Sequence, residues 1–297
     1  GIRRPGRKTK DRIGIKTGII CFLSVGRINS RQMLNSFSAY PMMLMGLQKY
    51  FIENDMSMIF THSVGHDDDI PVCLDKKYCD GVVVFGRDYH MGDKLLERLK
   101  SMPTVWCGGW KVDDDLKCFD QVVYDNSKVG SVAADYLVKR GHGKVVCFVQ
   151  QKDYNLLSER GHSFVSTCRK HGVDAAALAC DIVPKPTFYD RADSLALEFI
   201  AKHGDATGAF FSTDDFMLGV CTRLQARNYD FEKLDIIGCN NEMQFLEHFR
   251  QTPASIDICF EEVGYKTADR LHERIKCFNR IKPEVINYKP KIIVHDT

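Results

Sequence analysis

The stretch that decides the fold is residues 124–142, YDNSKVGSVAADYLVKRGH, which is followed at 144–149 by the apolar run KVVCFV. Apolar side chains in it recur at positions 129, 132, 133, 136 and 137, the spacing of one helix face. Asp125 or Asn126 can cap the start of such a helix, and Gly141 can end it. The pattern predicts a helix over 126–140 that leads into a buried strand.

The same alternation of apolar runs and amphipathic stretches extends along the chain. Runs that predict buried strands lie at 17–23, 56–61, 80–86, 144–149, 207–212 and 234–238. Stretches with helical periodicity lie at 40–54, 91–101, 126–140, 158–172, 190–203, 214–227 and 261–278. Strands that are apolar throughout and alternate with helices indicate parallel sheets covered on both faces. The number of elements favours two such lobes rather than one.

Charge is distributed unevenly along the 297 residues, whose formal net charge is +2. Residues 1–12 hold six Lys or Arg against one Asp, which leaves 35 Lys and Arg against 38 Asp and Glu in the remainder. A mildly acidic body is a poor ligand for duplex DNA, because phosphate neutralisation dominates such affinity. The basic segment can either contact DNA or be a solvated terminus. No apolar run approaches the ~20 residues of a membrane span, so no membrane partner is expected.

The twelve cysteines do not follow the spacing of a metal site or a disulfide framework, since no two of them form a C-x-x-C pair. Several lie inside apolar strand-like runs, among them Cys21, Cys107 and Cys147. We therefore expect reduced thiols that act as small apolar side chains, and a cytoplasmic protein.

Catalytic signatures are missing from the sequence. It contains no G-x-x-x-x-G-K-[ST], no G-x-G-x-x-G after a strand and no G-x-S-x-G. His62, His66 and the acidic residues 67–69 lie in a polar segment between strands, which favours a solvated loop over a metal site. We expect no cofactor, no metal and no catalytic residue. One alternative function, nevertheless, is that of an α/β enzyme of unrecognised type.

Several local patterns follow one another in a characteristic order. After the Asp125 helix and its Gly-His end come SERGHSF at 158–164, TGAFFSTDDFMLGV at 207–220, DIIGCNN at 235–241 and EEVGYKTADRL at 261–271. In this order and at these separations they resemble the lactose/galactose-repressor family of transcription regulators. The resemblance extends from about residue 14 to the C-terminus and is weaker in the N-terminal lobe.

The resemblance implies a periplasmic-binding-protein-like type I fold with two Rossmann-like lobes. The N-terminal lobe would comprise 14–125 and 257–286, the C-terminal lobe 126–256 and 287–297, and residues 1–13 a basic linker. A sugar or related metabolite would bind in the cleft between the lobes and change DNA affinity allosterically in a homodimer. The family's helix-turn-helix headpiece, which contacts operator DNA, would be absent from this chain, because its first strand begins by about residue 17.

Two arguments select candidate ligand-binding residues. Ligands of open α/β sheets bind beyond the carboxyl ends of the strands, and Ser24, Trp110, Asp214 and Asn240 are among the residues at those positions. By resemblance, Arg160 matches the family's effector-contacting arginine. Phe188 or Tyr189 lies about where the family often has an aromatic side chain against the ligand.

Two of these positions depart from the family pattern. Asp214 stands where the family usually has Asn, and Asn240 where it usually has an effector-binding Asp. A carboxylate only accepts hydrogen bonds, whereas an amide both accepts and donates, so the usual polyol pose is in doubt. An alternative function on the same fold is a solute-binding protein of a sugar transport system, against which the unpaired cysteines argue.

Overall fold

The computed structural model describes residues 14–26, 39–66, 69–86, 91–108, 117–150, 155–179, 188–278 and 280–295, except for the side chains at positions 39, 155–157, 188 and 189. The chain divides into two compact units. Unit 1 comprises Gly1–Val123 and Phe260–Asn287, and unit 2 comprises Tyr124–Cys259 and Tyr288–Thr297. The predicted basic segment 1–13 lies outside the described residues.

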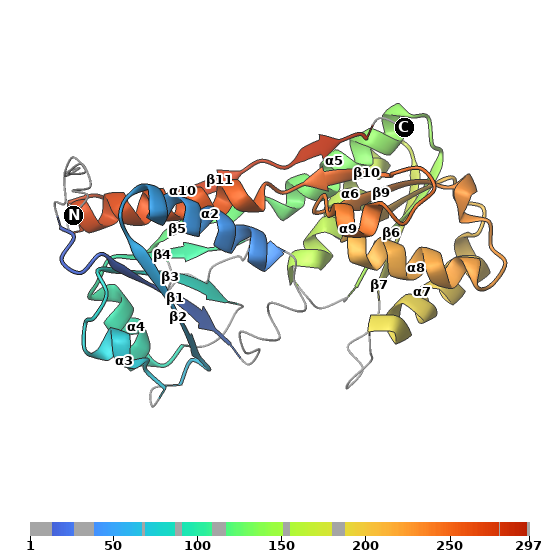
Figure 1. Cartoon of the computed structure of the whole chain (residues 1–297). Helices are drawn as coiled ribbons and strands as arrows, with labels where there is room; N and C mark the ends of the chain where they lie inside the picture. Colours follow the sequence, from blue (N-terminus) through green and yellow to red (C-terminus); the bar gives the residue numbers. More distant parts are fainter. Residues whose placement is uncertain are drawn as a thin grey trace, which may run out of the picture. The chain divides into compact units, whose positions relative to one another are not determined.

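Unit 1 contains a six-stranded sheet of order β11-β5-β4-β3-β1-β2 (Figure 1). Its strands are β1 (Ile19–Val25), β2 (Ser57–Ser63), β3 (Gly81–Gly86), β4 (Thr104–Cys107), β5 (Asp120–Tyr124) and β11 (Val285–Tyr288). The four neighbouring pairs from β5 to β2 are parallel. Its helices are α2 (Ala39–Glu53), α3 (Val72–Asp75), α4 (Asp93–Lys100) and α10 (Phe260–Lys276).

The helices of unit 1 cover both faces of the sheet (Figure 1). Leu74 of α3 and Leu95 and Leu99 of α4 pack on one face, against β1, β3 and β4. On the other face α2 and α10 lie so close together that a Cβ atom at Gly46 would meet the Glu261 carbonyl oxygen at 1.9 Å. The apolar runs are therefore buried on both sides, as doubly wound sheets require.

Unit 2 contains a second six-stranded sheet, of order β12-β10-β9-β8-β6-β7 (Figure 1). Its strands are β6 (Lys144–Val149), β7 (Asp174–Ala179), β8 (Gly208–Phe211), β9 (Asp235–Cys239), β10 (Ala254–Asp257) and β12 (Lys291–Ile293). Only β12 among these runs antiparallel to its neighbour. Its helical elements are α5 (Asn126–Lys139), α6 (Asn155–Lys170), α7 (Phe188–His203), α8 (Asp214–Gln225), η2 (Phe231–Lys233) and α9 (Met243–Leu246).

The core of unit 2 contains stacked aromatic rings. The rings of Phe148 and Phe211 lie 4.6 Å apart and are nearly parallel, at 3°. They belong to a cluster of buried side chains that α7, α8 and α9 contribute to one face of the sheet. On the opposite face α5 packs against α6, and a Cβ atom at Gly130 would lie 2.0 Å from the carbonyl oxygen of Arg160. Glycine at position 130 thus allows the backbones of α5 and α6 to meet.

The helix predicted over 126–140 begins and ends as its sequence indicates. The Asp125 carboxylate accepts a hydrogen bond from the Lys128 N–H at 2.9 Å and caps α5. The helix ends at Lys139, and Gly141 adopts φ +86° just beyond it. His142 then hydrogen-bonds Thr207 at 3.0 Å and Asp235 at 2.9 Å, which ties the end of α5 to the starts of β8 and β9.

The predicted fold class, two parallel α/β sheets covered by helices, is confirmed. Some strands of the structure are not among the apolar runs that predicted strands, notably β5, β7 and the short strands β10 to β12. β7 reads DAAALA and lacks the β-branched residues by which the other strands are recognised. No helix in the described part of the chain has the length and apolarity needed to cross a bilayer.

Unit 1 is also held by a buried ionic cluster. The side chain of Asp120, which has no exposed surface, accepts hydrogen bonds from Arg270 at 2.9 and 3.0 Å and from Arg274 at 2.6 Å. The backbone N–H of Glu284 donates to the same carboxylate at 2.9 Å. One carboxylate thereby joins β5, α10 and the segment before β11, and its two arginine partners compensate its burial.

Candidate functional site

The carboxyl edge of the unit 2 sheet brings together polar residues from several strand ends. Because β6, β8 and β9 are parallel, the residues that follow them lie along the same edge (Figure 1). These residues are Gln150 after β6, Ser212–Asp215 after β8 and Asn240–Glu242 after β9. Helix α6 adds Arg160, which is 3 % exposed.

Asp214 is completely buried, and its carboxylate joins several segments of this edge through hydrogen bonds to Ser255 and Glu242. We call this arrangement the clamp. The Ser255 hydroxyl donates to the two carboxylate oxygens of Asp214 at 2.9 and 3.0 Å, and the Glu242 N–H donates to Oδ2 at 2.8 Å. Burial raises the pKa of Asp214 to about 6, although these hydrogen bonds favour the charged form. The carboxylate therefore holds the starts of α8 and α9 and strand β10 together.

Gly238 makes room for this carboxylate. A Cβ atom at Gly238 would lie 1.9 Å from Oδ1 of Asp214. A side chain at position 238 would push the carboxylate away, since a buried carboxylate that accepts from two donors cannot move aside without losing them.

The turn after β9 has an unusual backbone. Asn240 and Asn241 adopt φ values of +109° and +57°, in the region that favours glycine and, among other residues, asparagine. The Asn240 N–H donates to the Ile256 carbonyl at 2.8 Å, and the Asn241 N–H donates to the Ser255 hydroxyl at 3.0 Å. The Asn240 amide donates to Oε2 of Glu242 at 2.9 Å. Strand β10 thus holds the turn in a strained form.

Four buried polar atoms at this edge have no hydrogen-bond partner among the described residues. They are Oγ of Ser212, Oδ1 of Asn240, Oδ1 of Asn241 and Oε1 of Glu242. Each such atom costs about 1–3 kcal/mol if it stays unpaired. Three of the four are amide or carboxyl oxygens, which accept hydrogen bonds. The edge therefore has the chemistry to receive a molecule that carries several O–H or N–H donors.

Glu242 is the residue that sequence reasoning missed. Burial raises its pKa to about 8, with additional repulsion from Asp215 and Asp214, while the Asn240 hydrogen bond and Arg160 act in the opposite direction. At neutral pH its carboxyl group is thus largely protonated and can both donate and accept. The sequence signal was its place three residues after β9, beside the Asn240-Asn241 pair.

The Arg160 side chain is buried among the residues of the carboxyl edge and is not exposed at its surface. Its Nε donates to Oδ1 of Asn126 at 2.9 Å, and its Nη1 donates to the Ser212 carbonyl and, at 3.4 Å, to Sγ of Cys239. The guanidinium therefore connects α5 to the ends of β8 and β9. Among the predicted site residues, the structure brings Arg160, Asp214 and Asn240 into this one region.

The remaining predicted residues belong to unit 1 or lie where the structure describes no side chain. Ser24 lies within β1, not after it as expected, because that strand continues to Val25; its buried hydroxyl is 3.4 Å from Nδ1 of His62. Trp110 lies outside the described residues, and Phe188 is described only as the first backbone position of α7. Among the described residues no group of His, Cys, Asp or Glu side chains is arranged to hold a metal ion.

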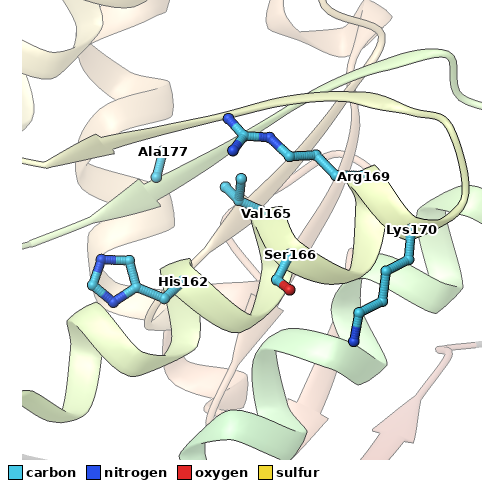
Figure 2. Close-up of a pocket in the computed structure, with 6 residues that line it drawn as sticks. All are labelled: His162, Val165, Ser166, Arg169, Lys170 and Ala177. Atoms are coloured by element: carbon cyan, nitrogen blue, oxygen red, sulfur yellow. The ribbon is translucent and has the colours of Figure 1, made fainter.

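A separate open pocket lies on the outer side of α6. It measures about 620 Å³ and is lined by His162, Val165, Ser166, Arg169, Lys170 and Ala177. Figure 2 shows that the His162, Arg169 and Lys170 side chains point in different directions rather than toward a common centre. None of the four unpaired atoms lines this pocket, so the carboxyl edge is the stronger candidate site.

Parallel α/β units with polar residues at the carboxyl edge define a class of proteins that bind small molecules. The chain belongs to the periplasmic binding protein-like domain family, whose pattern matches residues 134–297.

The chain is similar to transcription regulators in sequence and in fold. It is 24% identical over 260 residues to the HTH-type transcriptional repressor PurR of Vibrio atlanticus (strain LGP32), covering 85% of this chain and 75% of that protein. Its fold matches a transcriptional regulator CelR–cellobiose complex (TM-score 0.72, 18% identity, 94% of this chain, 84% of that one). It also matches the trehalose repressor from Escherichia coli (TM-score 0.69, 17% identity, 93% and 100%). The resemblance to the effector-binding core of the lactose/galactose-repressor family is confirmed.

We expect Gly238→Ala to destabilise unit 2 by about 1–3 kcal/mol, the usual cost of overpacking, because the new methyl group would displace the Asp214 carboxylate. Gly143→Ala is the matched control, since a Cβ atom there meets nothing within 4 Å. The free energy of unfolding in urea measures both. Equal stabilities of the two variants would contradict the clamp.

The free energy of unfolding should fall as pH rises from about 5 to 8. Burial raises the pKa of Glu242 from 4.5 to about 8, so in this window the folded chain binds a proton that the unfolded chain has lost. Each such group contributes a slope of up to about 1.4 kcal/mol per pH unit. Urea unfolding at several pH values should show a shallower slope for Glu242→Gln than for the exposed control Glu247→Gln. Identical slopes in both variants would contradict a protonated Glu242.

Proposed function

We propose that this chain is the effector-binding core of a DNA-binding transcription regulator and that it binds a sugar or sugar derivative at the carboxyl edge of unit 2. The observation that carries the proposal is the row of unpaired buried oxygens on Asn240, Asn241 and Glu242. Polyol hydroxyl groups both donate and accept hydrogen bonds, so they can pair with the two amide oxygens and with the protonated Glu242 carboxyl group. The solved regulator structures with similar folds include a complex with cellobiose.

Binding rather than turnover is the activity that this edge supports. The Asp214 carboxylate, the best candidate for a catalytic base, is 0 % exposed and its oxygens are occupied by Ser255 and Glu242. An effector that binds one conformation better than another shifts the population of DNA-competent molecules. In the complete regulator, DNA affinity should therefore change when the effector is added.

The unpaired thiols and the names of the relatives support regulation in the cytoplasm over solute capture for transport. Cys107, Cys147 and Cys221 form no disulfide and lie deep in the cores. The alternative function, a solute-binding protein of a transport system, has no specific observation in its favour.

The ligand proposal is tested by isothermal titration of a panel of pentoses, hexoses, disaccharides, sugar phosphates and nucleobases. A sugar that binds the wild type should bind Asn240→Ala and Glu242→Gln about fivefold or more weakly, because each variant removes or alters a hydrogen-bonding group worth at least about 1 kcal/mol. Glu247→Gln changes an exposed carboxyl group nearby and should bind normally. A nucleobase as the only ligand would exclude the sugar, and a sugar bound equally by all variants would exclude this edge.

We also propose that the chain forms a homodimer through the outer faces of α2 and β2. Met45 and Ile52 of α2 are each 59 % exposed, and Phe60 of β2 is 55 % exposed. Large exposed apolar side chains on adjacent elements are typical of association surfaces.

Sedimentation velocity should therefore give a dimer for the wild type and a monomer for the double variant Met45→Glu and Ile52→Glu, because the introduced charges would be buried at the interface. Val72→Glu is the control, since Val72 is 65 % exposed on α3 and should leave the dimer intact. A monomeric wild type, or dimers in every variant, would contradict this surface.

A further inference from the structure

Three cysteine side chains meet on one face of the unit 1 sheet. Cys21 comes from β1, Cys73 from the short helix α3, and Cys79 from the segment before β3. The sulfur atoms of Cys21 and Cys73 are 3.7 Å apart. The Cys79 thiol approaches the Cys73 carbonyl oxygen at 3.9 Å and lies close enough to the Cys21 thiol for the two to affect each other's pKa. The sequence, in which these residues are 52 and 6 positions apart, gives no sign of this grouping.

The three thiols differ in accessibility, and Cys21 and Cys79 differ in acidity. Cys21 has no exposed surface and Cys79 is 6 % exposed, whereas Cys73 is only partly buried. The Cys79 thiol and burial raise the pKa of Cys21, while the Cys21 thiol lowers the pKa of Cys79. The group thus contains one thiol that a small solute can reach and two buried thiols behind it.

This grouping differs from the other core cysteines. Cys221 is surrounded by apolar side chains, and burial alone raises its pKa. Cys107 contacts Thr267 and Met43 rather than another thiol. A metal site does not explain the three thiols, because no group of described side chains is arranged to hold a metal ion.

We propose that Cys21, Cys73 and Cys79 form a redox-modification site at which a peroxide oxidises Cys73 and Cys21 to a disulfide. The accessible Cys73 sulfur attacks one peroxide oxygen; an S–O bond forms, the O–O bond breaks, and the released hydroxide leaves as water with the thiol proton. The product is the Cys73 sulfenic acid.

The second step closes the disulfide. The Cys21 sulfur attacks the Cys73 sulfur, an S–S bond forms and the S–O bond breaks. The Cys21 proton passes by way of the neighbouring Cys79 thiol to the leaving hydroxide, which gives a second water. Two thiols have then lost two electrons and two protons, and the peroxide has been reduced to two waters. The sulfur atoms must approach from 3.7 Å to about 2.05 Å, which a shift of the four-residue helix α3 can supply.

The disulfide would form close to the hydrogen bonds that hold residues 16–18, which lead into β1. Asp80, which follows Cys79, accepts hydrogen bonds from the backbone N–H groups of residues 16, 17 and 18 at 2.7–3.1 Å. A bond that pulls α3 toward β1 acts on the segment that holds Asp80. Oxidation therefore has a direct route to the residues ahead of the first strand.

The test treats the reduced full chain with hydrogen peroxide, blocks the remaining thiols with an alkylating reagent and maps the unreduced peptides by mass spectrometry. We expect a Cys21–Cys73 linked peptide that dithiothreitol removes. Cys73→Ser should lack this peptide and instead leave Cys21 open to alkylation on unfolding. Cys79→Ser should form the peptide more slowly, because it loses the proton acceptor.

Cys277→Ser is the matched control, since Cys277 is a partly buried thiol of the same unit and lies outside the group; it should form the linked peptide at the wild-type rate. Circular dichroism of each reduced variant verifies that it is folded. Oxidation of Cys73 to sulfinic or sulfonic acid without a linkage overturns the proposal. A linkage of Cys73 to any cysteine other than Cys21 also overturns it.

Discussion

The carboxyl edge of unit 2 depends on the buried carboxylate of Asp214. Burying a charged group costs several kcal/mol unless donors replace the lost water. Here the Ser255 hydroxyl and the Glu242 N–H supply them, and they come from β10 and from the start of α9. Because the donors belong to separate segments, satisfying one carboxylate fixes all of these segments in place. Gly238 is part of the same constraint, since only a residue without Cβ leaves room for Oδ1.

The clamp also explains how a strained turn persists beside it. Left-handed conformations of Asn240 and Asn241 cost of order 1–3 kcal/mol each, and they last only where neighbouring contacts over-determine them. Their backbone N–H groups are held by Ile256 and Ser255, the latter already bound to Asp214. The side-chain oxygens are then left without partners. These unpaired oxygens lower the stability of the folded chain, and a ligand that forms hydrogen bonds with them can restore it, as is common at binding sites.

Sequence reasoning reached the fold and the strand ends that make up the candidate site, and failed where tertiary burial decides. Periodicity and the Asp125 cap predicted α5 to within one residue of its end, because caps and helix period are local properties. β7 was missed because alanine has little β-propensity; its strand conformation comes from parallel pairing with β6 along its whole length. Asp214 and Asn240 were placed correctly at strand ends, but their burial depends on Ser255 and Gly238. Glu242 was missed for the same reason, since its raised pKa arises from residues distant in the sequence.

Compared with the family that this chain resembles, an acid and an amide have changed places at positions 214 and 240. The structure gives this exchange a consistent physical interpretation. Asp214 carries its carboxylate where the family usually has an amide, and the structure points that carboxylate inward, onto Ser255. Asn240 presents an amide oxygen where a carboxylate is usual, and the neighbouring Glu242 is mostly protonated at neutral pH. The acceptors left for a ligand are therefore close to neutral. Neutral acceptors discriminate against cations and favour uncharged molecules with several donors, because no buried charge needs to be balanced. Raising the pH above about 8 would place a carboxylate there and reverse that preference.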